Sequence, residues 1–103
     1  MPNRVLKYET VDDEIEAVIL YYESISYELG LKFEAEIENA LDHLENHPFQ
    51  YFNLAGKIHR RINIEGFPYA LIYCIVENDG LIKMLFPQLN DPAKLWTRLA
   101  KQP

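Results

Sequence analysis

The sequence has little cysteine and no long apolar segment. Cys74 is the single cysteine, so no disulfide can form within the chain. It lies in an apolar run over residues 70–76, where we predict a buried small hydrophobe and not a nucleophile. No apolar run approaches the roughly 20 residues of a membrane-spanning helix. The segment Met1–Arg4 lacks a signal peptide's apolar stretch. We therefore expect a cytoplasmic protein that does not bind membranes.

Patterns that hold metals or cofactors are also missing. His43 and His47 are four residues apart at a helix end, a spacing that permits a pair of ligands. No third ligand stands at a metal-binding spacing, so we interpret them as surface histidines. The sequence has no glycine-rich phosphate loop and no Ser/His/Asp set. We predict no metal and no cofactor.

What is present suits a small folded domain. The chain has 103 residues, of which 49% are hydrophobic and 13% aromatic. This apolar content is enough for one modest core and argues against disorder. We predict a single domain over residues 1–103.

Charge is unevenly distributed around the net value of −6. Residues 1–50 hold 12 Asp/Glu against 3 Lys/Arg, a net charge of −9, whereas residues 51–103 hold 4 against 7, a net charge of +3. An acidic chain binds nucleic acid poorly, so we expect no direct sequence-specific binding. The basic half can still contact phosphate or an acidic partner. The acidic half is interpreted as solvated helix faces.

Helical spacing dominates the first half. A short strand over residues 4–8 precedes the first helix. Thr10 is the expected N-cap of this helix, which ends near residues 24–26. A second helix follows and runs to about Glu45, where His47-Pro48 stops it. Two consecutive amphipathic helices predict a helical hairpin.

Strand periodicity dominates the second half. Residues 58–64 alternate, residues 70–76 are apolar throughout as in a central strand, and residues 81–86 return after a turn at Asn78-Asp79-Gly80. Asp91-Pro92 starts a short last helix. The order predicts an α+β fold, β-α-α-β-β-β, with the helical hairpin packed on an antiparallel sheet and a short C-terminal helix. We expect these residues to be largely buried: Ile37, Leu41, Leu44, Ile62, Leu71 and Tyr73.

Several short motifs follow one another along the chain. The first helix contains "EA…YYE" over residues 16–23, and the second begins with "LG…F" over residues 29–33. The second helix ends in "L…L…P…Y" over residues 41–51. The strands contain "RR…FPY…Y" at Arg60-Arg61, Phe67-Pro68-Tyr69 and Tyr73, and the last helix contains "DP…W…R" at Asp91-Pro92, Trp96 and Arg98. In this order, the motifs resemble those of the ParE/RelE superfamily of bacterial toxins.

The resemblance implies the toxin of a type II toxin–antitoxin pair. ParE-type members inhibit DNA gyrase by binding, and RelE-type members cleave messenger RNA on the ribosome. Both types are held inactive by a cognate antitoxin. The chain departs from the nuclease branch, because Ala70, Pro87 and Asn90 occupy positions where that branch tends to place Arg or His. Cleavage through the 2′-hydroxyl needs a proton acceptor and cations around the phosphate.

A ParE-like, binding-only toxin is therefore our leading hypothesis. An endoribonuclease with substituted catalytic residues and a detoxified homologue that only binds an antitoxin are the alternatives. We name no catalytic residue. The candidates for contact with the target, gyrase or ribosome, are His59, Arg61, Lys94 and Arg98. For Arg61 the competing interpretation is an ion pair with a helix carboxylate.

Overall fold

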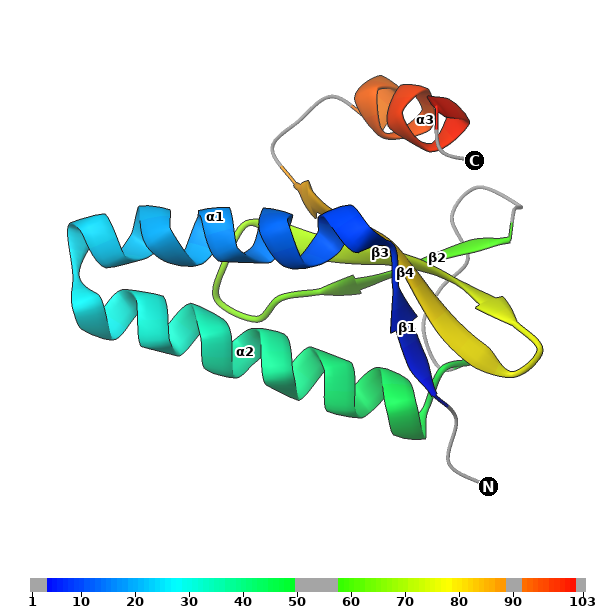
Figure 1. Cartoon of the computed structure of the whole chain (residues 1–103), viewed down its shortest axis with the longest axis horizontal. Coiled ribbons are helices and arrows are strands. Elements are labelled where there is room, and N and C mark those ends of the chain that lie inside the picture. Colours follow the sequence, from blue (N-terminus) through cyan, green and yellow to red (C-terminus); the bar gives the residue numbers. More distant parts are fainter. Residues whose placement is uncertain (1–3, 50–57, 89–91, 102–103) are drawn as a thin grey trace.

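The secondary-structure elements follow the predicted order. The computed structural model describes residues 4–49, 58–88 and 92–101. The elements are β1 (Val5–Lys7), α1 (Glu9–Ile25), α2 (Tyr27–Asn46), β2 (His59–Asn63), β3 (Tyr69–Val76), β4 (Asp79–Pro87) and α3 (Pro92–Lys101). Figure 1 shows the long α1–α2 hairpin beside the sheet, with α3 apart from the hairpin. The α+β class is confirmed.

The sheet is mixed, and not purely antiparallel as the sequence suggested. Its order is β1-β4-β3-β2, with antiparallel pairs β2–β3 and β3–β4 and a parallel pair β1–β4. Short turns impose antiparallel pairing on consecutive strands, whereas β1 is separated from β4 by most of the chain and has no such constraint. Arg4 aligns the starts of the two strands, because its backbone N–H and its guanidinium both donate to the Asp79 carboxylate, at 3.1 and 2.8 Å.

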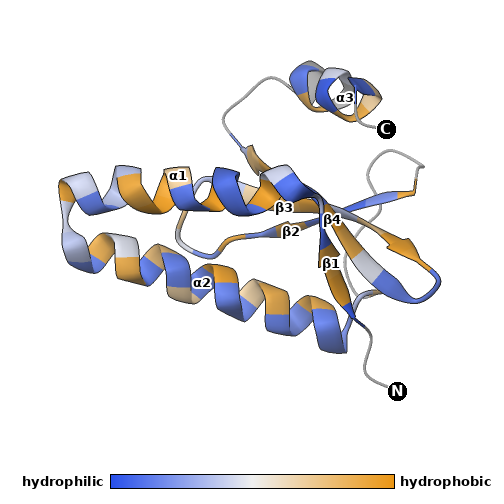
Figure 2. Ribbon diagram, in the orientation of Figure 1, coloured by the Kyte–Doolittle hydropathy of each residue, from blue (hydrophilic) through white to orange (hydrophobic). Residues whose placement is uncertain are grey.

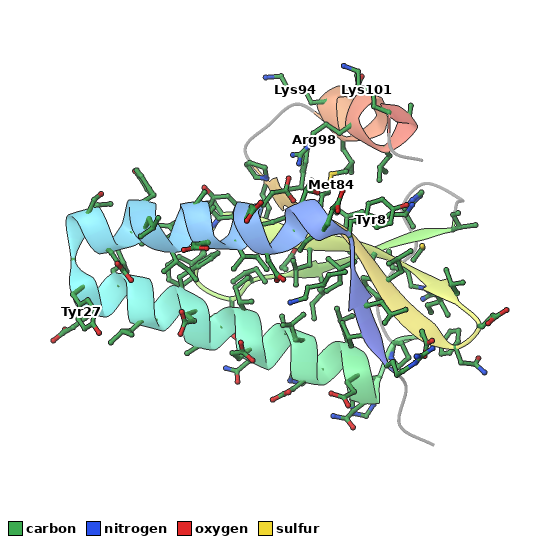
Figure 3. All side chains as sticks on the ribbon, in the orientation of Figure 1. Tyr8, Tyr27, Met84, Lys94, Arg98 and Lys101 are labelled. Carbon is green, nitrogen blue, oxygen red and sulfur yellow. The ribbon has the colours of Figure 1, made fainter. Side chains whose placement is uncertain are left out.

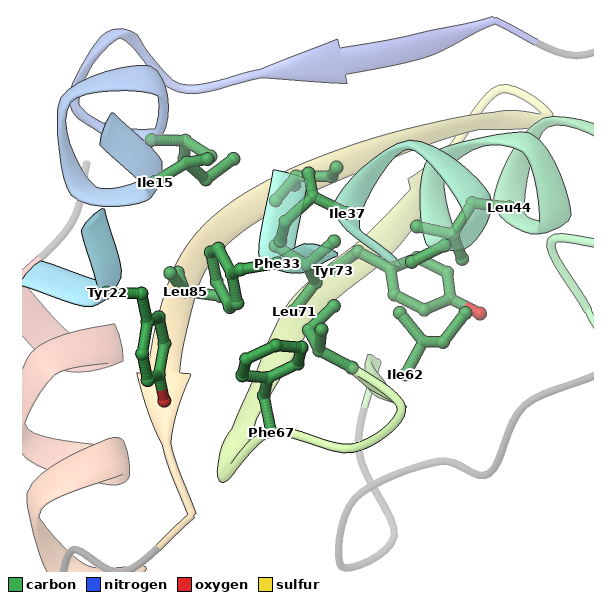
Figure 4. Close-up of a cluster of buried hydrophobic side chains, with 14 residues drawn as sticks. Ile15, Tyr22, Phe33, Ile37, Leu44, Ile62, Phe67, Leu71, Tyr73 and Leu85 are labelled. Atoms are coloured by element: carbon green, nitrogen blue, oxygen red, sulfur yellow. The ribbon is translucent and has the colours of Figure 1, made fainter. Parts of the chain in front are cut away.

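The main core lies between the hairpin and one face of the sheet. Figure 4 shows aromatic and aliphatic side chains from α1, α2, β2, β3 and β4 meeting there, and the orange apolar stripes of Figure 2 follow the same elements. Tyr22, Phe33 and Phe67 contact one another edge-on or tilted, with ring centroids 4.9–5.4 Å apart. Five of the six residues expected to be buried are buried, and Leu41 is half-buried at the margin of this core.

The first helix begins one residue before the expected cap. Tyr8 is the N-cap, its side chain makes no capping hydrogen bond, and Thr10 lies inside the helix. The backbone carbonyl of Tyr8 accepts a hydrogen bond from the N–H of Val11. The backbone N–H of Tyr8 donates to the carbonyl of Ile82 in β4. The pairing of β1 with β4 thus sets where the chain leaves the sheet, and this overrides the local capping preference of Thr10.

The β3–β4 turn lies earlier in the chain than the predicted Asn78-Asp79-Gly80 and shares only Asn78 with it. Glu77 and Asn78 have positive φ angles of 52° and 71° and form the two-residue loop, while Asp79 and Gly80 already belong to β4. A two-residue hairpin loop with positive φ at both positions is the turn that matches strand twist. Because Arg4 binds Asp79 and Val5 pairs with Gly80, those two residues are held in the strand.

A second, smaller core covers part of the opposite face. Along β3 the side chains alternate, so Ile72 points away from the hairpin, where it packs with Met84, Phe86 and Leu95, and Leu99 lies against this group. The last helix α3 therefore packs on the side of the sheet that the hairpin does not cover. We call that side the second face.

Candidate functional site

Two of the four predicted target-contact residues lie together on the second face. His59 and Arg61 are two residues apart on β2, so their side chains point to the same face of the sheet. They pair with Cys74 and Ile72 of β3, so this is the face that holds Ile72. The strand β2 is an edge of the sheet. His59 is half-buried and Arg61 is exposed.

Arg61 is held by an amide and not by a helix carboxylate. Its Nε donates to Oδ1 of Asn63 at 2.9 Å, and the same oxygen accepts from Nε2 of Gln88 at 2.8 Å. Within residues 4–49, 58–88 and 92–101 it forms no ion pair. The described residues therefore do not support the competing interpretation, in which Arg61 forms an ion pair with a helix carboxylate. A neutral partner orients the guanidinium and leaves its charge to act on a ligand.

His59 stands in a mildly desolvated and cationic setting. Burial lowers the pKa of its imidazole below the ordinary value of 6.5, and the nearby Lys83 charge lowers it further. Burial also raises the pKa of the neighbouring Cys74 thiol, against the opposing effect of Lys83. Both shifts favour the uncharged side chain, and Cys74 is the buried small residue that the sequence predicted.

Lys83 is a member of this site that the sequence analysis missed. The β3–β4 register runs from Ile72↔Met84 to Tyr73↔Ile82, which leaves Lys83 as an extra residue at a bulge. Its Nζ donates to the Tyr8 hydroxyl at 2.6 Å and lies 4.5 Å from the centre of that ring. One signal was available, because Lys83 is the only charged residue in the apolar stretch from Leu81 to Phe86.

Arg98 is engaged within the fold. It forms a 2.6 Å ion pair with Oε2 of Glu14, and its guanidinium lies 5.6 Å from the Phe86 ring centre. The other carboxylate oxygen of Glu14 accepts from the backbone N–H of Leu85 at 3.1 Å. One carboxylate on α1 thus joins α3 to β4, beyond the point where the short β1 stops pairing.

Lys94 does not join the group on the second face. It is exposed on α3, and Figure 3 shows Lys94 and Lys101 pointing away from the protein while Arg98 points toward its body. The structure therefore brings His59 and Arg61 to one face, with the Lys83 charge near His59, and separates Lys94 from them.

Two of the three positions that depart from the nuclease pattern lie within the described residues. Ala70 is buried on β3, and Pro87 ends β4 opposite Tyr69. Asn90 lies outside the described residues. What remains is a small cationic surface with one neutral imidazole, which suits binding of an acidic or phosphate-bearing group. Among the described residues, no helix is long and apolar enough to cross a membrane.

Comparison with known proteins identifies the fold. No protein-family model matches the chain, and no curated protein matches it. Among solved structures, it is similar to a chain of the "Chromosomal ParDE TA system from P. aeruginosa", with a TM-score of 0.71 and 15% sequence identity, covering 82% of this chain and 95% of that one. The two chains share one fold. The fold implied by the ParE/RelE resemblance is therefore confirmed.

Proposed function

We propose that this chain is the toxin component of a type II toxin–antitoxin system, that it inhibits DNA gyrase by binding, and that it acts in the cytoplasm. The fold shared with the ParDE chain, over 82% of this chain and 95% of that one, carries the proposal. The ParE/RelE-like segments support it separately, because they are features of the amino-acid sequence and not of the fold. A cognate antitoxin is the implied partner.

Binding without cleavage is favoured by the residues at two positions that depart from the nuclease pattern. Ala70 and Pro87 supply neither positive charge nor a proton donor or acceptor where the nuclease branch tends to have them. Removing one cation from a developing phosphate charge costs on the order of 3 kcal/mol, or about a hundredfold in rate. Losing two such groups leaves a surface that recognises a partner better than it catalyses a reaction.

The residues that would contact the target are His59 and Arg61. Both sit on an edge strand, and Arg61 is exposed with its charge available. We expect Arg61→Ala to weaken target binding about tenfold or more, since an exposed, oriented arginine is a common hot spot at protein interfaces.

Controlled expression in a bacterial host tests the proposal. The wild-type chain should stop growth and induce DNA-damage signalling, and the product of the adjacent gene should restore growth. Purified protein should inhibit supercoiling by gyrase, with Arg61→Ala weaker and the outward-pointing Lys101→Ala unchanged. Normal growth together with unaffected supercoiling would favour a detoxified homologue that retains only antitoxin binding.

One observation favours RNA cleavage as the second candidate. The lowered pKa of His59 makes its imidazole a proton acceptor at neutral pH, and Arg61 lies beside it on the same strand. If the protein acts only by binding, the wild-type chain should cleave messenger RNA on programmed ribosomes no faster than Arg61→Ala does. Cleavage that is lost in Arg61→Ala and in His59→Gln would replace gyrase binding with this second function.

A further inference from the structure

The second face of the sheet is only partly covered. The last helix α3 packs on Ile72, Met84 and Phe86. Strand β4 begins at the β3–β4 turn and its other end leads to α3, and Figure 1 shows that turn, in yellow, away from α3. Near the turn, the side chains of Leu6 and Val76 are 42% and 47% exposed. Within the described residues, this end of the second face is therefore accessible to a partner.

A row of paired residues crosses all four strands at this end. Leu6 of β1 pairs with Leu81 of β4, which pairs with Cys74 of β3. Cys74 in turn pairs with His59 of β2. Paired residues point to the same face, and Cys74 is two residues from Ile72, so the row lies on the second face. With Val76, two residues beyond Cys74, we call this group the cross-strand row; it consists of Leu6, Val76, Leu81, Cys74 and His59.

Positive charge borders the cross-strand row. Arg61 is two residues from His59 on the same face, and Asn63 orients its guanidinium through a 2.9 Å hydrogen bond. After burial, the Lys83 charge is the second influence on the pKa of both His59 and Cys74, so this charge is close to the row. The two cations stand on β2 and β4, which are roughly 10 Å apart because neighbouring strands are about 4.8 Å apart.

Acidic residues near this end of the sheet are already engaged. Asp79 accepts from the backbone N–H and the guanidinium of Arg4 at 3.1 and 2.8 Å, and the Glu77 charge also acts on Arg4. The helices α1 and α2 carry six acidic residues each, but they pack on the other face of the sheet. An acidic partner is therefore attracted to the second face and repelled by the hairpin.

The cross-strand row suits an acidic protein segment better than a nucleic acid. Its exposed apolar side chains, Leu6 and Val76, are aliphatic, whereas single-stranded nucleic acids stack on aromatic side chains. Affinity for a duplex comes from neutralising many phosphates, and a chain with a net charge of −6 does this poorly. An aliphatic side chain of a partner can instead pack on the row while neighbouring carboxylates meet Arg61 and Lys83.

We propose that the cross-strand row is the surface on which the target protein docks, through a segment that places an aliphatic side chain on the row and carboxylates beside Arg61 and Lys83. The proposal rests on the proposed function, because it names what the target-contact surface recognises. It extends the contact from β2 across the sheet to β1, and it assigns the contact to protein and not to the DNA that gyrase holds.

Biolayer interferometry with gyrase, assembled from its purified subunits and free of DNA, tests the assignment. The wild-type chain should bind. The double variant Leu6→Ser/Val76→Ser should bind about tenfold or more weakly, since well-packed apolar anchors at an interface contribute on that scale. Arg61→Glu/Lys83→Glu should also bind about tenfold or more weakly, because it places like charges opposite the carboxylates of the partner.

Matched controls separate the row from general surface effects. Ile58→Ser removes an apolar side chain that is 73% exposed beside β2, one residue from His59 and therefore of the opposite strand parity. Lys101→Ala removes a lysine that points away from the protein on α3. Both should bind gyrase as the wild type does, and so should Leu6→Met, which keeps an apolar side chain of similar volume. Circular dichroism of the serine variant should match the wild type.

The two proposals fail in different ways. If the wild-type chain inhibits supercoiling and both double variants bind gyrase as tightly as it does, the docking surface is wrong and the toxin proposal stands. Binding that requires DNA would assign the contact to nucleic acid and would overturn the docking proposal. If the wild-type chain neither binds gyrase nor stops growth, both proposals are wrong.

Discussion

The half-buried imidazole of His59 provides a direct test of the second face. Its pKa is lowered mainly by burial and secondarily by Lys83, so NMR titration should give a midpoint below 6.5. Lys83→Met should raise that midpoint only part of the way, because burial is the larger cause. A midpoint at or above 6.5 in the wild type would show that His59 is not half-buried beside the Lys83 charge.

The same shift has a consequence for stability. Between the pKa of folded His59 and 6.5, the unfolded chain binds more protons at this residue than the folded chain does. The contribution of His59 to stability is therefore fully present above pH 6.5 and is lost as the pH falls below it. His59→Gln should remove this part of the pH dependence of the free energy of unfolding, measured by urea denaturation at several pH values.

The contacts that single side chains make were harder to predict from the sequence than the elements were. The strand parity of residues 58–64 correctly placed His59 and Arg61 on one face, because alternation is a local property. The contact between Arg98 and Glu14 joins residues 84 apart, and no local pattern encodes it. Arg98 stays a candidate for target contact, and its ion pair with Glu14 also holds α3 against the rest of the fold.

At the scale of elements, Gly30 controls how closely α1 and α2 approach. In an exposed helix, Gly→Ala stabilises by about 1 kcal/mol. Here Gly30→Ala should destabilise by roughly 1–3 kcal/mol, because the new Cβ meets Cγ of Glu23 at 2.3 Å and the Ile19 carbonyl at 3.3 Å. Thermal or urea denaturation of the purified variant measures the change.

A double-mutant cycle separates this contact from helix propensity. Glu23→Ala removes the clashing Cγ, so Gly30→Ala should cost less in that background than in the wild type. An equal cost in both backgrounds would show that the two side chains do not interfere.

Periodicity predicted the elements well and their junctions less well. The bounds of α1 and α2 follow from the apolar spacing and from His47-Pro48, and both are within two residues of expectation. The predicted cap at Thr10 and the predicted turn at Asn78-Asp79-Gly80 lie too late in the chain, because β1 pairs with β4 and holds Tyr8, Asp79 and Gly80 in place. Likewise, no short turn signals the direction of β1, so its parallel pairing could not be derived from the sequence.

For the whole molecule, the centre of the sheet should be the last part to open. The strand β3 is paired on both sides, and its residues 70–74 are all buried. Amide exchange by mass spectrometry should therefore be slowest in β3, and faster in the edge strands β1 and β2. Faster exchange in β3 than in β2 would contradict the strand order.

The pairing of β1 with β4 also affects when the protein can finish folding during synthesis. Arg4 binds Asp79, 75 residues later, so the first strand has no partner until most of the chain has been made. At 5–20 residues per second this wait is roughly 4–15 seconds. A nascent chain therefore emerges with its acidic hairpin complete and its sheet unfinished. For a chain proposed to be toxic, the surface that needs the finished sheet, with His59 and Arg61 on β2, is therefore completed last.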